Sequence, residues 1–123
     1  MNWIKLVKIS TWFLLLILAH ACTTKELSNF DSKSWKKDEN GCLGSRKALV
    51  ETVLARKQEI LGYTEVEILR NFGKPDVNDL RRRQQKFYYY YVSGSDKCPN
   101  QENAKILKFR FNAIDKVQEI LYE

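Results

Sequence analysis

The stretch of residues 61–76, LGYTEVEILRNFGKPD, constrains the fold of this chain more than any other. Thr64 and Glu67 have the spacing of a capping box, in which both side chains accept hydrogen bonds from backbone N–H groups at a helix start. A helix is therefore expected to begin at Glu65. Gly73 lies where a left-handed C-terminal cap needs no Cβ, and Pro75 prevents further helix. The apolar stripe of this short helix comprises Val66, Ile68, Leu69 and Phe72.

A longer amphipathic helix is predicted immediately before it, over about residues 46–61. Ser45 is the expected N-cap of this helix, and Gly62 the residue that ends it. The apolar residues at helical spacing are Leu49, Val50, Val53, Leu54, Ile60 and Leu61. One face of the helix should therefore cover another layer of the domain.

Residues 87–92, FYYYYV, predict a strand because aromatic and β-branched residues favour extended backbone. Both faces of this strand are apolar, so one alternate set should pack on the helices. The other set would lie half exposed or contact a partner, for which Tyr is well suited. Tyr88 and Tyr90 are candidates for that partner surface, although the pattern does not decide which set is buried.

Two further strands are expected after a loop that contains Cys98. In residues 104–112, Leu107, Phe109 and Phe111 share one face of a half-buried strand. A turn over residues 112–115 leads to a third strand over 117–122. The predicted fold is a two-layer α+β domain, with two N-terminal helices packed on a three-stranded antiparallel sheet, in the order ααβββ.

The sequence resembles the SmpA/OmlA family in three features. These are the helix start and stop residues within 61–76, the aromatic strand that follows, and the F-x-F strand at Phe109 and Phe111. The members of this family are the BamE-like lipoproteins of bacterial outer membranes. The resemblance covers about residues 61–121, with 46–60 as the preceding helix, and its motif is structural and not catalytic. It implies the same element order, and a place beside the machinery that inserts β-barrels into the outer membrane.

Residues 1–21 have the form of a secretory signal peptide. Lys5 and Lys8 give a basic start, and Ala19-His20-Ala21 gives a small-x-small cleavage site. The uninterrupted apolar run is about ten residues, against the ~20 needed to cross a bilayer. Cleavage is the expectation, and an uncleaved anchor that also uses residues 3–7 is the alternative.

Cys22 directly follows this cleavage site and resembles the lipidated Cys of a bacterial lipobox. Ala19 stands where lipoboxes usually carry Leu, and His20 is unusual there. Cleavage by ordinary signal peptidase, which would leave a free thiol, is the alternative. Lipidation predicts an exported protein held in the outer membrane and facing the periplasm, or exposed at the cell surface.

The remaining cysteines, Cys42 and Cys98, form an even pair once Cys22 is set aside. A disulfide is predicted, because export leads to a compartment that permits one. Closing this loop would contribute about 4 kcal/mol in the chain-entropy model. Two separate thiols are the alternative, whereas a zinc site lacks accompanying ligands.

Residues 22–40 are polar and lack an apolar period, which predicts a flexible tether before a domain over residues 41–123. Trp35 is the exception within this segment. Docking of Trp35 on the domain near Cys42 and contact with a partner are both compatible with the sequence.

The sequence contains no recognisable catalytic motif, so the chain is expected not to be an enzyme. The single histidine, His20, lies in the predicted leader, which removes the imidazole from general-base or metal-site chemistry. Asp76 and Asp79 follow a helix stop, where solvated turn residues are common. No phosphate-binding glycine loop or nucleophile elbow is present, and no cofactor or metal is expected.

Charge gives a further candidate site. Lys5 and Lys8 account for two of the 21 basic residues, so 19 remain against 15 acidic ones, a net charge of about +4. A basic cluster before the tyrosine strand would favour anionic surfaces in the envelope, and export argues against nucleic acid. A solvated face whose arginine stems cover the strand end is the alternative. The cluster comprises Lys74, Arg81, Arg82, Arg83 and Lys86.

Two functional hypotheses follow. The first is an envelope lipoprotein, attached to the membrane through its N-terminal lipid, whose small domain binds another envelope protein as an accessory or scaffold subunit in outer-membrane assembly or maintenance. The second is a secreted or tethered module of similar fold that binds or inhibits a ligand, without a role in barrel assembly. A lipid on Cys22 would favour the first hypothesis.

Overall fold

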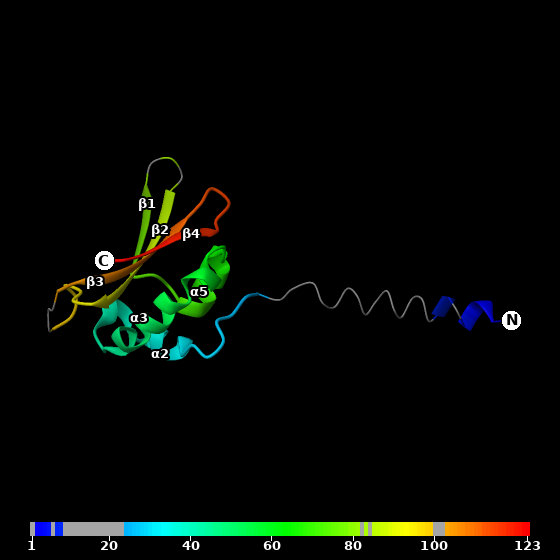
Figure 1. Ribbon diagram of the computed structural model, residues 1–123, viewed down its shortest axis with the longest axis horizontal. Coiled ribbons are helices and arrows are strands. Elements are labelled where there is room, and N and C mark those ends of the chain that lie inside the picture. Colours follow the sequence, from blue (N-terminus) through cyan, green and yellow to red (C-terminus); the bar gives the residue numbers. More distant parts are fainter. Residues whose placement is uncertain (1, 6, 9–23, 82, 84, 100–102) are drawn as a thin grey trace.

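The computed structural model describes residues 2–5, 7–8, 24–81, 83, 85–99 and 103–123. It is an α+β domain in which the helices pack on one face of an antiparallel sheet (Figure 1). The helical elements of the domain are α2 (Ser32–Lys37), the 3-10 helix η2 (Glu39–Gly41), α3 (Ser45–Ala55), α4 (Lys57–Ile60) and α5 (Glu65–Phe72). The strands are β1 (Val77–Arg81), β2 (Gln85–Ser93), β3 (Lys105–Phe111) and β4 (Val117–Tyr122).

The sheet has four strands in the order β1-β2-β3-β4, one more than predicted. Every neighbouring pair is antiparallel. The additional strand, β1, occupies an edge, and its sequence VNDLR shows no buried position. The residues of β1 are exposed or half-buried, so its sequence shows no alternation of apolar and polar residues. Asn and Asp are also poor strand formers, and the sequence therefore does not predict this strand. The prediction of a three-stranded sheet was therefore wrong at this edge.

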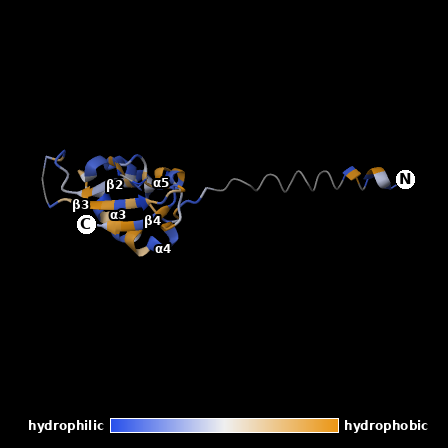
Figure 2. Cartoon of the chain, turned by 90° about the horizontal axis from the view of Figure 1, so that it is seen from above, coloured by the Kyte–Doolittle hydropathy of each residue, from blue (hydrophilic) through white to orange (hydrophobic). Residues whose placement is uncertain are grey.

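The core lies between the sheet and the helices. The predicted inward set of β3, Leu107, Phe109 and Phe111, is buried as expected, and hydrophobic and hydrophilic residues alternate along this strand (Figure 2). Trp35 and Phe72 meet this layer from the helical side. The largest buried side chains also include Val50, Val53, Ile60, Tyr63, Ile68 and Tyr90.

Helix α5 confirms the predicted start. Thr64 accepts from the Glu67 N–H at 3.2 Å, and the Glu67 carboxylate accepts from the Thr64 N–H at 3.2 Å. The helix ends at Phe72, and Gly73 is its C-cap. The φ of 76° at Gly73 agrees with the predicted cap, but its ψ of −168° is not that of the left-handed helical region. Gly73 therefore ends the helix by turning directly into extended backbone.

The predicted helix over residues 46–61 is divided at Arg56, which separates α3 from α4. Arg56 has φ −113° and ψ 21°, and its guanidinium binds Glu59 and the backbone oxygen of Ser28. The predicted N-cap was also wrong. Helix α3 begins at Ser45 after Gly44, and a distant carboxylate, Asp38, accepts from the Arg46 N–H at 2.9 Å.

The described part of the predicted tether, residues 24–40, is folded onto the domain, so that prediction was wrong. Trp35 has no exposed surface and contacts the ring of Phe72 edge-on, with centroids 5.5 Å apart. Leu27 is also buried. Helix α2 has only six residues, too few to be stable alone, and it depends on this tertiary packing. Its polar sequence gave no signal because a single large side chain supplies the core contact.

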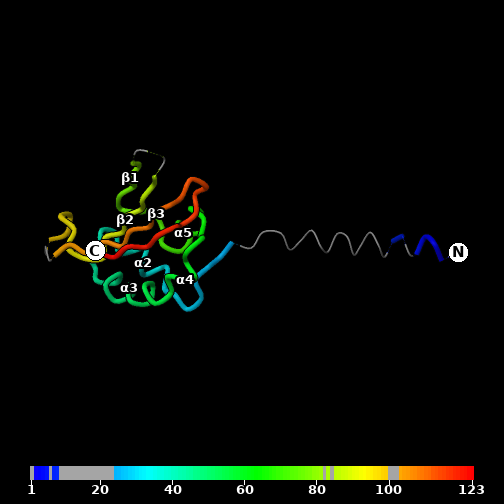
Figure 3. Tube along the Cα trace, turned by 45° about the horizontal axis from the view of Figure 1, so that its top comes forward, coloured from blue at the N-terminus to red at the C-terminus, as the bar shows by residue number. Residues whose placement is uncertain are grey.

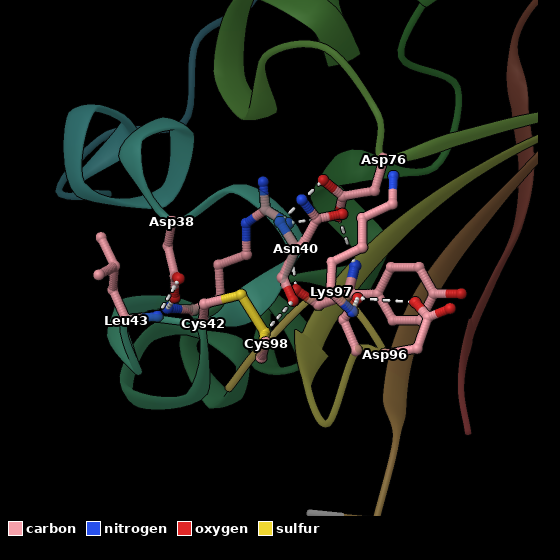
Figure 4. The surroundings of a disulfide bond; sticks show 11 residues. Asp38, Asn40, Cys42, Leu43, Asp76, Asp96, Lys97 and Cys98 are labelled. Atoms are coloured by element: carbon pink, nitrogen blue, oxygen red, sulfur yellow. Dashed lines mark hydrogen bonds and ion pairs between the residues drawn. A yellow bond between two sulfur atoms is a disulfide. The ribbon is translucent and has the colours of Figure 1, made fainter. Parts of the chain in front are cut away.

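The predicted disulfide between Cys42 and Cys98 is present and joins the end of η2 to the loop after β2 (Figure 4). Beside it, the Asp76 carboxylate accepts from the backbone N–H of Asn40 at 3.0 Å and of Tyr91 at 2.8 Å. Asp76 is therefore an interior structural residue and not a solvated turn residue. The disulfide and this carboxylate both fix the η2 segment to the sheet.

Candidate protein-binding surface

The face of the sheet turned away from the helices is covered by no helix in the described part of the chain (Figure 1). We call it the open face. Pairing places its residues in rows across the strands, because alternate residues of each strand point to the same side. The row through Tyr89 runs Val77, Tyr89, Lys108, Leu121, and the row through Phe87 runs Asp79, Phe87, Arg110, Glu119. Tyr91 pairs with Ile106.

Aromatic rings occupy the middle of the open face. Phe87 and Tyr89 have ring centroids 6.1 Å apart. The Arg81 guanidinium lies 4.7 Å from the Phe87 centroid, and the Lys108 ammonium lies 5.1 Å from that of Tyr89. Phe87 is only 7 % exposed although no helix covers it. Neighbouring side chains therefore shield its ring and leave the two tyrosines as the accessible aromatic groups of β2.

Ion pairs border these rings. Arg81 binds Asp79 at 3.0 Å, Lys108 binds Glu123 at 2.7 Å, and Arg110 binds Glu119 at 2.8 Å. These three basic side chains of the open face thus each have an acidic partner within the face. The charges balance locally, so the face should attract a partner through its aromatic and aliphatic groups more than through net charge.

The electrostatics of this surface favour fixed ionisation states. The hydrogen bonds from Tyr89 and Arg81 hold the pKa of Asp79 below its ordinary value. Partial burial, with the bond to Asp79, raises the pKa of Tyr89. The phenol donates to the Asp79 carboxylate at 2.8 Å. Tyr89 is therefore a neutral, oriented donor at neutral pH, without the character of a catalytic base.

The two tyrosines predicted for a partner surface lie in the interior instead. Tyr88 is 3 % exposed and donates to the Glu65 carboxylate, while Tyr90 is fully buried and donates to the Gly73 oxygen at 2.7 Å. That choice of residues was wrong. Tyr89 and Tyr91 are the alternate set on the open face. The run of four tyrosines does not indicate which alternate residues face the helices, since both sets have the same side chain.

The predicted basic cluster does not form one surface. Arg81 points to the open face, whereas Lys86 lies on the helical side, where it binds Glu65 at 2.7 Å and Asp115 at 3.0 Å. Lys74 and Arg83 are exposed, and Arg82 lies outside the described residues. The strand pairing explains the separation, because side chains of odd and even position leave opposite faces of the β1–β2 hairpin.

Other predicted features of the N-terminus are not described. Cys22 and most of the predicted leader lie outside the described residues. Among the residues that the structure describes, no helix has both the length and the apolar content to cross a bilayer.

The described residues offer no cluster of side chains suited to a metal centre. No group of three or more His, Cys, Asp or Glu side chains within them could hold a metal ion. A hollow beside the disulfide, bounded by Cys42, Lys47 and Pro99, has a volume of about 250 Å³. Pockets for small molecules usually measure about 300–1,000 Å³. The open face is the better candidate surface, because it combines accessible aromatic rings with satisfied polar groups.

Among known proteins, no protein-family model, curated protein or solved structure matches this chain. The interpretation of the open face therefore rests on its own geometry.

Proposed function

We propose that this chain is a bacterial envelope lipoprotein whose domain binds another envelope protein through the open face. The protein is exported, loses residues 1–21 and is anchored by a lipid on Cys22 in the outer membrane, facing the periplasm. It acts as an accessory or scaffold subunit in outer-membrane assembly or maintenance, as the resemblance to the SmpA/OmlA family implies. It is not an enzyme and takes no cofactor.

The disulfide is the observation that carries this proposal. The chain has three cysteines, and the bond between Cys42 and Cys98 leaves Cys22 as the odd one. A stable disulfide is typical of proteins that leave the cytoplasm. The odd cysteine is also the first residue after the predicted cleavage site. This agreement between pairing and position supports both export and lipidation.

The open face supports the binding role. Its accessible aromatic and aliphatic groups are Val77, which is 37 % exposed, and the half-buried Tyr89, Tyr91, Ile106 and Leu121. Tyrosine combines a large contact area with a polar hydroxyl, and it is enriched where proteins bind one another. Because the charged side chains around these groups are already paired, a partner would not leave an isolated charge buried.

The lipid is tested by an intact mass of the protein extracted from washed membranes of its native host, without reduction and with free thiols alkylated. We expect a chain that begins at Cys22 and carries acyl groups, with no alkylation at Cys42 or Cys98. A chain that still begins at Met1, or an unlipidated chain that alkylates, would overturn the lipoprotein assignment and leave the ligand-binding module as the better account.

The binding role is tested by photo-crosslinking from position 91 in the native envelope, followed by identification of the linked protein. We expect Tyr91→Ser to weaken copurification of that protein with the otherwise native chain. The matched control is Val66→Ser, which removes an exposed apolar side chain, 59 % accessible, from α5. Equal loss in both variants, or crosslinks from position 66 alone, would show that the open face is not the binding surface.

A further inference from the structure

The segment that precedes helix α2 is fastened to helix α5 by one buried side chain, Asn71. Its amide oxygen accepts from the Leu27 N–H at 2.9 Å, and its amide nitrogen donates to the Lys25 oxygen at 3.1 Å. Asn71 is only 3 % exposed. The side chain thus pairs with the backbone of residues 25–27 in the way that a neighbouring strand would.

Further contacts hold the same segment on both sides of this point. The Arg70 guanidinium donates to the Thr24 hydroxyl, and the Arg56 guanidinium donates to the Ser28 oxygen. The Ser32 hydroxyl donates to the backbone oxygen of Asn71 at 2.5 Å. In Figure 3 this segment runs along the α4 and α5 side of the domain. We call residues 24–32 the strap.

The strap leaves almost no free chain before it. Thr23 is the one residue between Cys22 and Thr24 in the sequence. Two residues of extended chain span at most about 7 Å. A domain of about 100 residues has a radius of gyration of about 13 Å. The distance from the α-carbon of Cys22 to Thr24 is therefore shorter than the radius of the domain. A lipid on Cys22 could not hold the domain away from the membrane surface.

We propose that the lipid-anchored domain lies directly on the bilayer surface, with one defined end toward the lipid. That end, the anchored end, comprises Thr24 and Lys25 with Arg56 and Arg70, which contact the strap. The opposite end is the loop after β2 that contains Lys97 and the disulfide, which lies away from the strap in Figure 1. The occupant of the anchored end is the membrane to which Cys22 is attached, and this inference rests on the proposed lipidation of Cys22.

Exposure at the anchored end agrees with such a contact. Thr24, Lys25 and Arg70 are exposed, while the buried part of the strap, Leu27, faces the core. No large apolar side chain of the described residues is exposed within this set. The end should therefore rest against polar headgroups without inserting into the hydrocarbon region. The lipid on Cys22 would supply the insertion.

The orientation can be measured on the domain of residues 22–123 without native lipidation. With Cys42 and Cys98 oxidised, Cys22 is the one free thiol, and it can be coupled to a maleimide lipid in nanodiscs that also contain a gadolinium-chelating lipid. Paramagnetic broadening of amide signals falls steeply with distance. We expect the amide signal of Arg70, whose side chain contacts Thr24, to be attenuated several-fold more than the Lys97 signal.

The matched control is the same domain with a Gly-Ser segment of about 12 residues inserted after Cys22, whose end-to-end distance averages about 20 Å. In this variant the difference between the Arg70 and Lys97 signals should largely disappear. Similar attenuation of both signals in the native-length protein, or an unchanged difference after the insertion, would overturn the proposed orientation. Since the lipid is attached chemically, this result is independent of whether the native host lipidates Cys22, which the intact mass decides.

Discussion

The guanidinium of Arg46 and the carboxylate of Asp76 form an ion pair in the interior of the domain, with 2.6 Å between Nη1 and Oδ2. Their side chains are 1 % and 5 % exposed. Arg46 also donates to the Trp35 oxygen at 3.0 Å and to the Tyr91 oxygen at 3.1 Å. One side chain therefore joins helix α3 to helix α2, to strand β2 and to the start of β1.

Replacing this arginine should be among the most damaging single changes. Arg46→Met leaves the Asp76 carboxylate buried without its counter-ion, and such a loss typically costs about 3–5 kcal/mol. Urea denaturation of the purified domain would measure this cost. Arg81→Met, which removes an exposed ion pair, is the control and should change the unfolding midpoint little. Equal midpoints for both variants would contradict a structural role for the buried pair.

Gly73 should resist substitution more than Gly44. Both have positive φ, but the ψ of −168° at Gly73 lies in a region that is essentially restricted to glycine. A Cβ there would lie 2.8 Å from Cγ of Lys36, whereas a Cβ at Gly44 would meet no atom within 4 Å. We expect Gly73→Ala to cost about 3 kcal/mol and Gly44→Ala about 1 kcal/mol. Thermal unfolding of the two variants gives the comparison, and similar losses would refute the special status of Gly73.

Glu65 should make stability depend on pH under acidic conditions. Hydrogen bonds from Lys86 and Tyr88 hold the pKa of Glu65 below its ordinary value. The unfolded-state pKa of a glutamate is about 4.3. Because the folded pKa is the lower one, this stabilisation is complete above the unfolded value and is lost as the pH falls through the folded value.

The variant Glu65→Gln tests this dependence. Its urea midpoint should be lower than that of the native chain at neutral pH, and the difference should shrink as the solution is acidified. Glu51→Gln, at an exposed position of α3, is the control and should follow the native curve. A constant difference between Glu65→Gln and the native chain at every pH would argue against the carboxylate contact.

The disulfide should contribute substantially to stability. It closes a loop with a sequence separation of 56, for which the chain-entropy model gives about 4 kcal/mol. Replacing Cys42 and Cys98 together by Ser should therefore lower the unfolding midpoint strongly, and reduction of the native chain should act in the same direction. Cys22→Ser provides the control, since this position precedes the strap. A midpoint unaffected by reduction would show that the other contacts of η2 are sufficient.

Asn71 should decide whether the strap stays bound. Asn71→Ala removes the partners of the Leu27 N–H and the Lys25 oxygen, and each unsatisfied buried group costs about 1–3 kcal/mol. We expect trypsin to cleave after Lys25 much faster in this variant. Cleavage after Lys97, at the opposite end, should keep its native rate if the rest of the domain is intact. An unchanged rate at Lys25 would show that the strap does not depend on Asn71.

The parts of the fold that sequence predicted well are those with local signals. The capping box of Thr64 and Glu67 acts within four residues, and the alternation in β3 needs only one strand. The disulfide followed from a count of cysteines. The first two features are determined by residues close in sequence. The disulfide could be predicted because three cysteines allow few pairings.

The parts that sequence missed depend on distant contacts. Strand β1 exists because it pairs with β2, and α2 exists because Trp35 reaches the core. The helices that cover Tyr88 and Tyr90 determine which face of β2 is buried. The sequence does not indicate this face, because four consecutive residues of the strand are all tyrosine. Tyr88 and Tyr90, which were predicted for a partner surface, are therefore the buried set. The ion pairs Lys108–Glu123 and Arg110–Glu119 were not foreseen because each joins two separate segments of the chain.

The burial of Trp35 also provides a built-in optical probe. Residues 24–123 contain no other tryptophan, since Trp3 and Trp12 belong to the predicted leader. The indole is fully buried, beside Phe72 and within 5.4 Å of the Arg46 guanidinium. Release of α2 into water would shift its emission to longer wavelength. Intrinsic fluorescence of the unlabelled domain therefore reports specifically on the docking of this short helix, and can be compared with circular dichroism to show whether α2 leaves before the sheet unfolds.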